Sequence, residues 1–279
     1  MDRLLILTDM SDMSLESNIK DWLEKGGFPF EFECAKAFNN HGFKITQGMH
    51  YYDKEIDAYR EIDISAYKQF HTGNFAFNIT FLVECKSLNK PWIVFMTDKT
   101  IHNDAFVEGL IMTTNGGQMR AALHNKSNNT FTFTMNGVEE MAYNIVEMES
   151  NKKDHAYEAT MQSHKACLSL LQDANNSRSS FCNIYIPVVI TSHQLFKVTP
   201  ITNHDPTEDP YNLEKIEFTK IVQSKAFEHP LTLHAVSAEG LENYLSQISK
   251  DIEAFFETYK VDIHHISTNY PVNSQVGKY

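Results

Sequence analysis

The sequence predicts an α/β fold in which a mixed sheet is flanked by helices. Two extended runs, 59–67 and 75–86, have the alternating or continuously apolar character of half-buried and fully buried strands. Apolar residues recur at helical spacing in 28–40, 155–173 and 238–259. Helices that alternate with strands in this way are typical of a sheet with helices packed on its faces.

Length and composition place the chain among soluble globular proteins. Its 279 residues suffice for one large domain or two small ones, and 42% hydrophobic with 22% charged residues is ordinary. No run approaches the roughly 20 apolar residues of a membrane span. The Leu4–Leu7 run is too short for a signal sequence, so we expect a cytoplasmic protein without membrane association.

The cysteines and histidines give no metal-binding signature. The four cysteines (Cys34, Cys85, Cys167 and Cys182) are far apart and include no Cys-x-x-Cys pair. This spacing argues against a zinc ribbon and against a disulfide scaffold, and favours buried, reduced side chains. The 13 histidines are scattered without ligand spacing.

The N-terminal part predicts two helices followed by a strand. Ser14 is a suitable N-cap for a helix that ends at Gly26-Gly27. Pro29 fits the first turn of the next helix, which runs to about Asn40. A short strand is expected over 42–48.

Two strands separated by a turn follow. In 59–67 the pattern places Ile62, Ile64 and Ala66 on one face and Asp63 on the other. Residues 68–74 form the turn. The run 75–86 is the central strand, and the apolar residues 92–95 extend the sheet.

Residues 97–150 read as an insertion that could close over a substrate. The alternation in Phe131–Thr134 predicts a strand, and Asn136-Gly137 predicts a hairpin turn. Gly116-Gly117 lacks the Lys-Ser/Thr end of a nucleotide-binding loop, so we interpret it as a plain turn.

The rest of the chain predicts two more helices and several strands. After the helix 155–173 come a buried strand, in which Pro187 implies a sheet edge or a bulge, and a second strand over 194–198. Residues 200–211 read as a surface loop. Further strands are expected at 216–222 and 231–236, before the long helix 238–259. The aromatic stripe of that helix suits either core packing or a partner surface.

The stretch Arg60–Lys86 carries the chemistry. Glu84 and Lys86 project to the same side of a buried strand, and burying such charges unpaired is costly. A divalent cation that bridges Glu84 to Asp63 would compensate. Mg²⁺ accepts one or two protein carboxylates, and the backbone carbonyl of Cys85 could be a further ligand. Lys86 would then orient a water molecule or neutralise charge on a phosphoryl group.

These residues resemble the PD-(D/E)xK nuclease superfamily. The ordered pattern of Asp63, a hairpin-sized gap and Glu84-Cys85-Lys86 carries the resemblance, with Ile62 in place of the family's proline. The family's helix acid matches Glu31 better than Glu33, because Glu31 shares the face of the buried stripe. A glutamine on the second core helix matches Gln162, although that residue could equally face solvent. Lys165, one turn later, could contact a phosphate or be solvated.

The resemblance spans about residues 28–200 and implies a fold, an activity and partners. It implies a single restriction-endonuclease-like domain over 1–279, with an insertion at 97–150 and a C-terminal α+β extension at 201–279. It implies endonucleolytic hydrolysis that depends on Mg²⁺ or Mn²⁺, most simply of double-stranded DNA, by a homodimer that defends its cell against foreign DNA. The opposing interpretation is a hairpin with solvated ends, in which Glu84 and Lys86 are a simple same-face pair.

The net charge of −12 is the main evidence against an independent DNA-binding enzyme. One net-positive window, 86–130, follows the Glu-x-Lys strand and carries five basic and three acidic side chains. The charge leaves open a noncatalytic or partner-activated subunit of a larger complex, in which a partner protein supplies the basic surface. RNA remains an alternative substrate.

Overall fold

The computed structural model places an α/β protein built on one large sheet. It describes residues 14–23, 25–72, 75–87, 89–97, 112–113, 141–149, 153–176, 181–201, 209–223 and 231–269. The expected strand at 131–134, the Asn136-Gly137 turn, Gly116-Gly117 and most of the net-positive window lie outside these ranges. Within the ranges, no helix combines the length and apolar character that crossing a bilayer requires.

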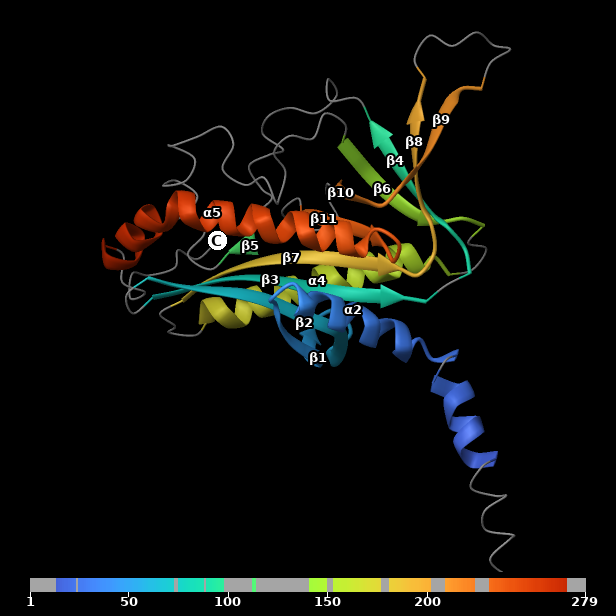
Figure 1. Ribbon diagram of the computed structural model, residues 1–279, viewed down its shortest axis with the longest axis horizontal. Coiled ribbons are helices and arrows are strands. Elements are labelled where there is room, and N and C mark those ends of the chain that lie inside the picture. The colour runs from blue at the N-terminus through green and yellow to red at the C-terminus, as the bar shows by residue number, and fades with distance from the viewer. Residues whose placement is uncertain are drawn as a thin grey trace, which may run out of the picture.

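Within the described ranges the sheet has 11 strands, and ten of them follow the order β1-β2-β3-β7-β11-β10-β6-β4-β8-β9 (Figure 1). β5 pairs with β7 beside this path. Parallel pairs join β3 to β7, β7 to β11, β10 to β6 and β4 to β8, and the other neighbours are antiparallel. The strands are β1 (Lys44–Asp53), β2 (Ala58–Thr72), β3 (Phe75–Lys86), β4 (Trp92–Thr97), β5 (Met112–Thr113), β6 (Met141–Glu147), β7 (Phe181–Thr191), β8 (Leu195–Pro200), β9 (Tyr211–Ile216), β10 (Phe218–Gln223) and β11 (Leu231–Ser237).

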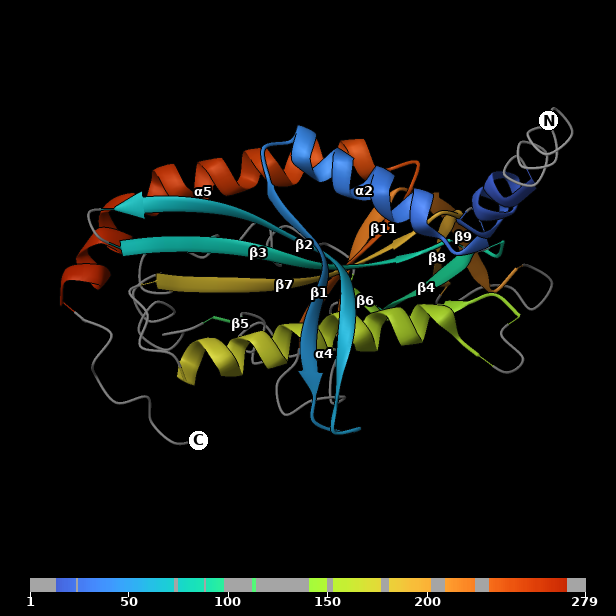
Figure 2. The ribbon, with the colours of Figure 1, turned by 90° about the horizontal axis from the view of Figure 1, so that it is seen from below.

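Helices cover both faces of this sheet. α2 (Phe28–Asn40) and α5 (Leu241–Asn269) lie on one face, and α4 (His155–Asn176) lies on the other (Figure 2). The largest apolar cluster joins α2 and α5 to the central strands, and two smaller clusters include residues of α4. The prediction of a mixed sheet flanked by helices is therefore confirmed.

The hairpin of β1 and β2 passes from one helix layer to the other (Figure 2). Ile64 and Ala66 belong to the cluster with α2 and α5, whereas Ile62 packs with Ala166 and Cys167 of α4. The prediction that Ile62 shares a layer with Ile64 and Ala66 is wrong, because strict alternation holds only for a strand that stays in one plane.

The strongest sequence patterns gave the best boundaries. β3 has the predicted ends, and the helix predicted at 155–173 is α4. The N-terminal helix is described over 14–23. β1 and β2 are longer than expected, and β5, β6 and β9 were not expected at all.

The C-terminal part belongs to the central sheet. β11 pairs in parallel with β7 and antiparallel with β10, so the strands after residue 201 continue the sheet at its middle. The stripe of α5 is buried in the largest cluster, which favours core packing over a partner surface for this helix.

Pro187 corrects one expectation. It belongs to β7 and lies opposite Leu82 of β3. β7 is an internal strand that is paired to β3 along its whole length. The hydroxyl of Ser163 on α4 donates to the Leu82 carbonyl at 2.7 Å and accepts from the Val188 amide at 3.0 Å. A side chain thus satisfies the backbone groups beside a proline that is not at a sheet edge.

Candidate active site

The C-terminal end of β3 gathers the acidic and basic residues that the sequence singled out. Asp63 of β2 is tied to this end, because its Oδ2 accepts a hydrogen bond from the Cys85 amide at 2.7 Å. Next to it, Glu84 is almost fully buried, with 2% of its surface exposed. The predicted contact of the Cys85 carbonyl with a cation remains a prediction. The backbone group of Cys85 that touches the site is its N–H.

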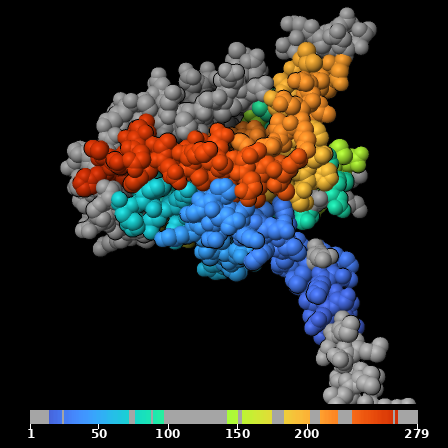
Figure 3. Space-filling model, viewed as in Figure 1, coloured from blue at the N-terminus to red at the C-terminus, as the bar shows by residue number. Residues whose placement is uncertain are grey.

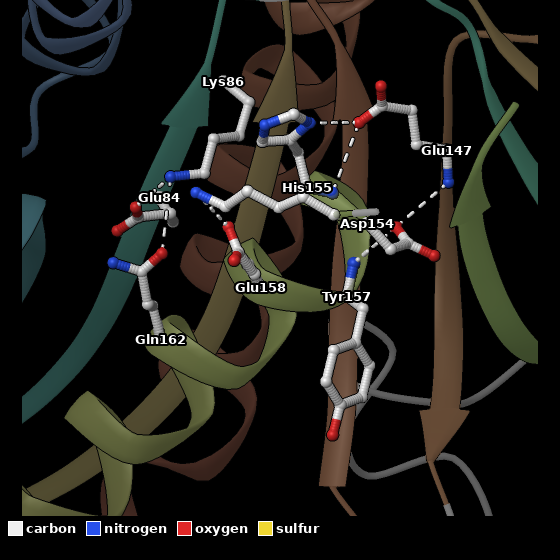
Figure 4. Close-up of polar contacts among 9 residues, drawn as sticks. Glu84, Lys86, Glu147, Asp154, His155, Tyr157, Glu158 and Gln162 are labelled. Atoms are coloured by element: carbon white, nitrogen blue, oxygen red, sulfur yellow. Dashed lines mark hydrogen bonds and ion pairs between the residues drawn. The ribbon is translucent and has the colours of Figure 1, made fainter. Parts of the chain in front are cut away.

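Lys86 links Glu84 to helix α4. Its Nζ donates to Glu84 Oε1 at 2.6 Å and to Gln162 Oε1 at 3.4 Å (Figure 4). The expectation that Glu84 and Lys86 project to the same side is confirmed by this ion pair. Gln162 faces the site and not solvent alone, since its amide oxygen meets the ammonium group.

Glu31 reaches the same region from the opposite helix layer. It is half-buried in the first turn of α2, and its Oε1 lies 3.8 Å from the position that a Cβ on Gly27 would take. Burial, together with the nearby charges of Asp63 and Glu61, raises its pKa to about 7, against the lowering by Lys86. Glu33 is exposed. The preference for Glu31 over Glu33 as the residue on the buried side of the helix agrees with this placement.

The carboxylates of the site oppose one another's ionisation. Burial, together with the charge of Asp63, raises the pKa of Glu84 to about 7, against the lowering by Lys86. Burial likewise raises the pKa of Asp63, while the Cys85 amide and Lys86 lower it. Glu84 Oε2 is buried and has no hydrogen-bond partner among the described residues. The single positive charge of Lys86 therefore does not balance the negative charges of Glu31, Asp63 and Glu84.

This arrangement fits a hard divalent cation held by few protein ligands. In the part of the chain that the structure describes, no three His, Cys, Asp or Glu side chains lie close enough together to hold a metal ion. Mg²⁺ needs only one or two carboxylates and keeps several of its waters. Asp63 and the unpartnered Oε2 of Glu84 are oxygen donors of this kind, so the residues present fit the ion.

Lys165 forms ion pairs with acids of the β1–β2 hairpin. Its Nζ donates to Asp53 Oδ2 at 3.1 Å and to Glu55 Oε2 at 2.7 Å, at the far end of that hairpin. Arg60 Nη1 lies 3.7 Å from the same Asp53 oxygen. The interpretation of Lys165 as a merely solvated lysine is wrong, because buried Asp53 demands a cationic partner. A contact of Lys165 with a phosphate remains a prediction.

Two further groups escaped the sequence analysis. The hydroxyl of Tyr51 is buried, and no described residue offers it a hydrogen bond. Burial raises its pKa to about 12, and the charges of Asp53 and Glu84 contribute, so the phenol stays protonated near Glu84. His155, at the start of α4, pairs through Nδ1 with Glu147 Oε2 at 2.5 Å (Figure 4). No motif marks either residue. His155 and Glu147 are only eight positions apart, but the spacing follows no recognised pattern, and the position of Tyr51 depends on how β1 is placed in the sheet.

Comparisons of the chain with models of protein families, with curated proteins and with solved structures find no match. The assignment of a function therefore depends on the geometry of the site and on the resemblance of its residues.

Proposed function

We propose that this chain is a metal-dependent endonuclease that hydrolyses phosphodiester bonds, most simply in double-stranded DNA. The observation that carries the proposal is the convergence of Asp63, Glu84 and Lys86 at the end of β3, with Glu31 and Gln162 beside them. Acids that raise one another's pKa around a single lysine are costly in a merely structural role, and such clusters concentrate at functional sites.

Each residue has a defined task in this proposal. Asp63 and Glu84 hold Mg²⁺ or Mn²⁺, which when bound supplies Lewis-acid activation and charge neutralisation. Lys86 holds its ammonium group toward the reacting phosphoryl group and donates hydrogen bonds to it or to the attacking water. Gln162 fixes the direction of the Lys86 side chain through its amide oxygen. Glu31, whose pKa lies near 7, can accept a proton close to neutral pH.

The order of the elements supports the restriction-endonuclease-like fold. α2 and the antiparallel strands β1, β2 and β3 come first, and α4 and β7 come after the intervening β4, β5 and β6, which is the order that the resemblance implies. The acids lie on β2 and β3, and the glutamine lies on α4 between the Glu-x-Lys strand and the strand parallel to it. The positions of these residues are consistent with the resemblance, and they favour a nuclease of this fold as the proposed function.

Plasmid digestion tests the proposal. The purified chain with Mg²⁺ should nick or linearise plasmid DNA, and EDTA should stop the reaction. Asp63→Ala, Glu84→Ala and Lys86→Ala should each reduce cleavage by at least about 100-fold with an unchanged circular dichroism spectrum. Lys90→Ala is the matched control, since Lys90 is a nearby lysine whose Nζ binds the Glu149 carbonyl. Full activity in the Lys86→Ala variant would contradict the assigned role.

The substrate class is decided in the same assay. Matched double-stranded DNA, single-stranded DNA and RNA of one sequence, digested side by side, should show fastest cleavage of duplex DNA. Cleavage of RNA alone would be consistent with the proposed metal site but would mean that the substrate is RNA and not DNA.

A second candidate function follows from the charge. The chain carries a net charge of −12, and among the described basic residues Lys165 and Arg60 are held by Asp53. An acidic surface of this kind favours a subunit that needs a basic partner protein to reach DNA. A gel shift at two salt concentrations separates the candidates. Binding by the chain alone that weakens steeply with salt supports the enzyme, and binding only with a partner supports the subunit.

A further inference from the structure

The N-terminal helix, residues 14–23, stands apart from the sheet and its covering helices (Figures 1 and 3). Every residue of this helix is exposed. Isolated helices shorter than about 12–15 residues are marginal in water, because nucleation costs more than a few backbone hydrogen bonds return. None of its side chains is buried by the described part of the chain, so burial of apolar surface adds little to its stability.

An apolar stripe runs along the helix and continues past its end. Leu15, Ile19, Trp22 and Leu23 recur at the spacing of one helix face, and all are exposed. The chain then turns at Gly26-Gly27, where Gly27 has a φ of 81°. A Cβ on Gly26 would lie 2.8 Å from the Phe28 ring, so glycine lets that ring approach. The rings of Trp22 and Phe28 lie 5.4 Å apart, and exposed Phe32 follows on α2.

Charges flank the stripe in pairs of opposite sign. Glu16 and Lys20 lie on one flank, and Asp21 and Lys25 lie on the other, as helical periodicity places them. A two-fold axis between antiparallel helices brings each flank against the same flank of its mate. With the axis near Ile19, where the apolar residues of two such stripes meet, Glu16 of each helix lies against Lys20 of the other. Asp21 and Lys25 are too far apart along the helices to pair in the same register. One flank of the stripe is therefore self-complementary in charge, beside an apolar stripe that is self-complementary too.

We propose that this stripe is the surface through which two copies of the chain associate, as an antiparallel pair of N-terminal helices. Residues 14–25 carry three acidic and two basic side chains, so this segment contributes little to the repulsion expected between two chains of net charge −12. An anionic membrane is a poorer occupant, because acids as well as lysines border the stripe and it lacks the basic face that such surfaces attract.

Sedimentation of the full-length chain tests the pairing. The wild type should sediment with the mass of two chains at high concentration, and Ile19→Glu or Trp22→Glu should reduce this to one. Val261→Glu is the control, since Val261 is 71% exposed on α5 and lies outside the stripe. Trp22 is exposed and Trp92 is fully buried, so the emission of the wild type should shift to longer wavelength on dilution. A Trp22→Phe variant should show no shift.

Charge variants decide whether the copies pair antiparallel. Lys20→Glu should raise the dissociation constant roughly tenfold, because symmetry counts each lost pair twice. The double exchange Glu16→Lys with Lys20→Glu should restore the wild-type value. A double exchange that pairs no better than Lys20→Glu would overturn the antiparallel arrangement. A wild type that stays monomeric and instead cosediments with phosphatidylcholine–phosphatidylserine vesicles would overturn the proposal.

Discussion

Glu84 shows how the acidic side chains of the site set its response to pH. Its pKa rises from 4.5 to about 7, so between these values the folded protein binds more protons than the unfolded chain. The free energy of unfolding therefore falls as pH rises through this window, and it levels off above pH 7. Glu31, with a pKa of about 7, contributes with the same sign. The site costs stability at neutral pH, and a bound cation would offset that cost.

Thermal unfolding with and without Mg²⁺ tests this electrostatic account. At pH 8 the ion should raise the unfolding midpoint, and at pH 5 it should raise it less, because protonated carboxyls bind the ion poorly. In Glu84→Gln the midpoint at pH 8 should rise without Mg²⁺ and gain less from the ion. Glu33→Gln, at an exposed position of α2, is the control. An equal gain in wild type and Glu84→Gln would place the ion elsewhere.

The two acids of α2 should differ in importance. Glu31→Ala should reduce Mg²⁺-dependent cleavage by about 10- to 100-fold, which is the usual loss when a group that supports a metal site is removed. Glu33→Ala should leave cleavage unchanged, because the side chain of Glu33 is exposed on the other face of the helix. Initial rates of plasmid nicking measure both. A greater loss in Glu33→Ala would mean that α2 presents its other face to the substrate.

The helix α4 matters to the site because hydrogen bonds from Ser163 hold it against the strand that carries Glu84 and Lys86. Ser163 bridges Leu82 of β3 and Val188 of β7, one residue after Gln162 reaches Lys86. The hydroxyl occupies a place where two backbone groups of neighbouring strands would otherwise remain unsatisfied. Ser163 therefore fixes both the sheet and the position of Gln162.

Ser163→Ala should lower the free energy of unfolding by about 1–3 kcal/mol, the cost of leaving buried backbone groups without partners. Chemical denaturation monitored by circular dichroism measures this loss. Thr258→Ala is the control, because its hydroxyl binds the Ala254 carbonyl on the exposed side of α5. A loss in Ser163→Ala no larger than in the control would mean that water replaces the hydroxyl without cost.

Helices and strands were predictable where the pattern of apolar side chains along one segment is enough to specify them. β3 is apolar along most of its length and α4 has a clear helical repeat, so both were located from the sequence. β9 was missed because five of its six residues are exposed, which removes the alternation that marks a half-buried strand. The site followed the same rule. Glu84 and Lys86 share a strand and were paired correctly, whereas Tyr51 lies on β1 and comes near Glu84 of β3 only because β1, β2 and β3 are neighbours in the sheet.

At the scale of the whole molecule, the order of the strands joins the two halves of the sheet. β11 forms hydrogen bonds with β7 on one side and β10 on the other, so the chain after residue 201 connects the strands of the site to β6, β4 and β8. No local pattern in the sequence specifies a pairing across about 40 residues. The expectation of a C-terminal extension came from reading this segment by itself, without the partners that its strands find.

This connection predicts that both halves unfold together. Leu245 is fully buried in the cluster beneath α5, whereas Trp92 is fully buried in a separate cluster with β6 and β8. Leu245→Ala should lower the free energy of unfolding by about 2–5 kcal/mol through loss of packing. In a Trp22→Phe background, the emission of Trp92 should move to lower denaturant together with the circular dichroism signal. Val261→Ala, on the exposed side of the same helix, should move neither. If Leu245→Ala shifts the circular dichroism signal and leaves the Trp92 transition in place, the halves are independent, because a cavity in one cluster would then not be felt across β11.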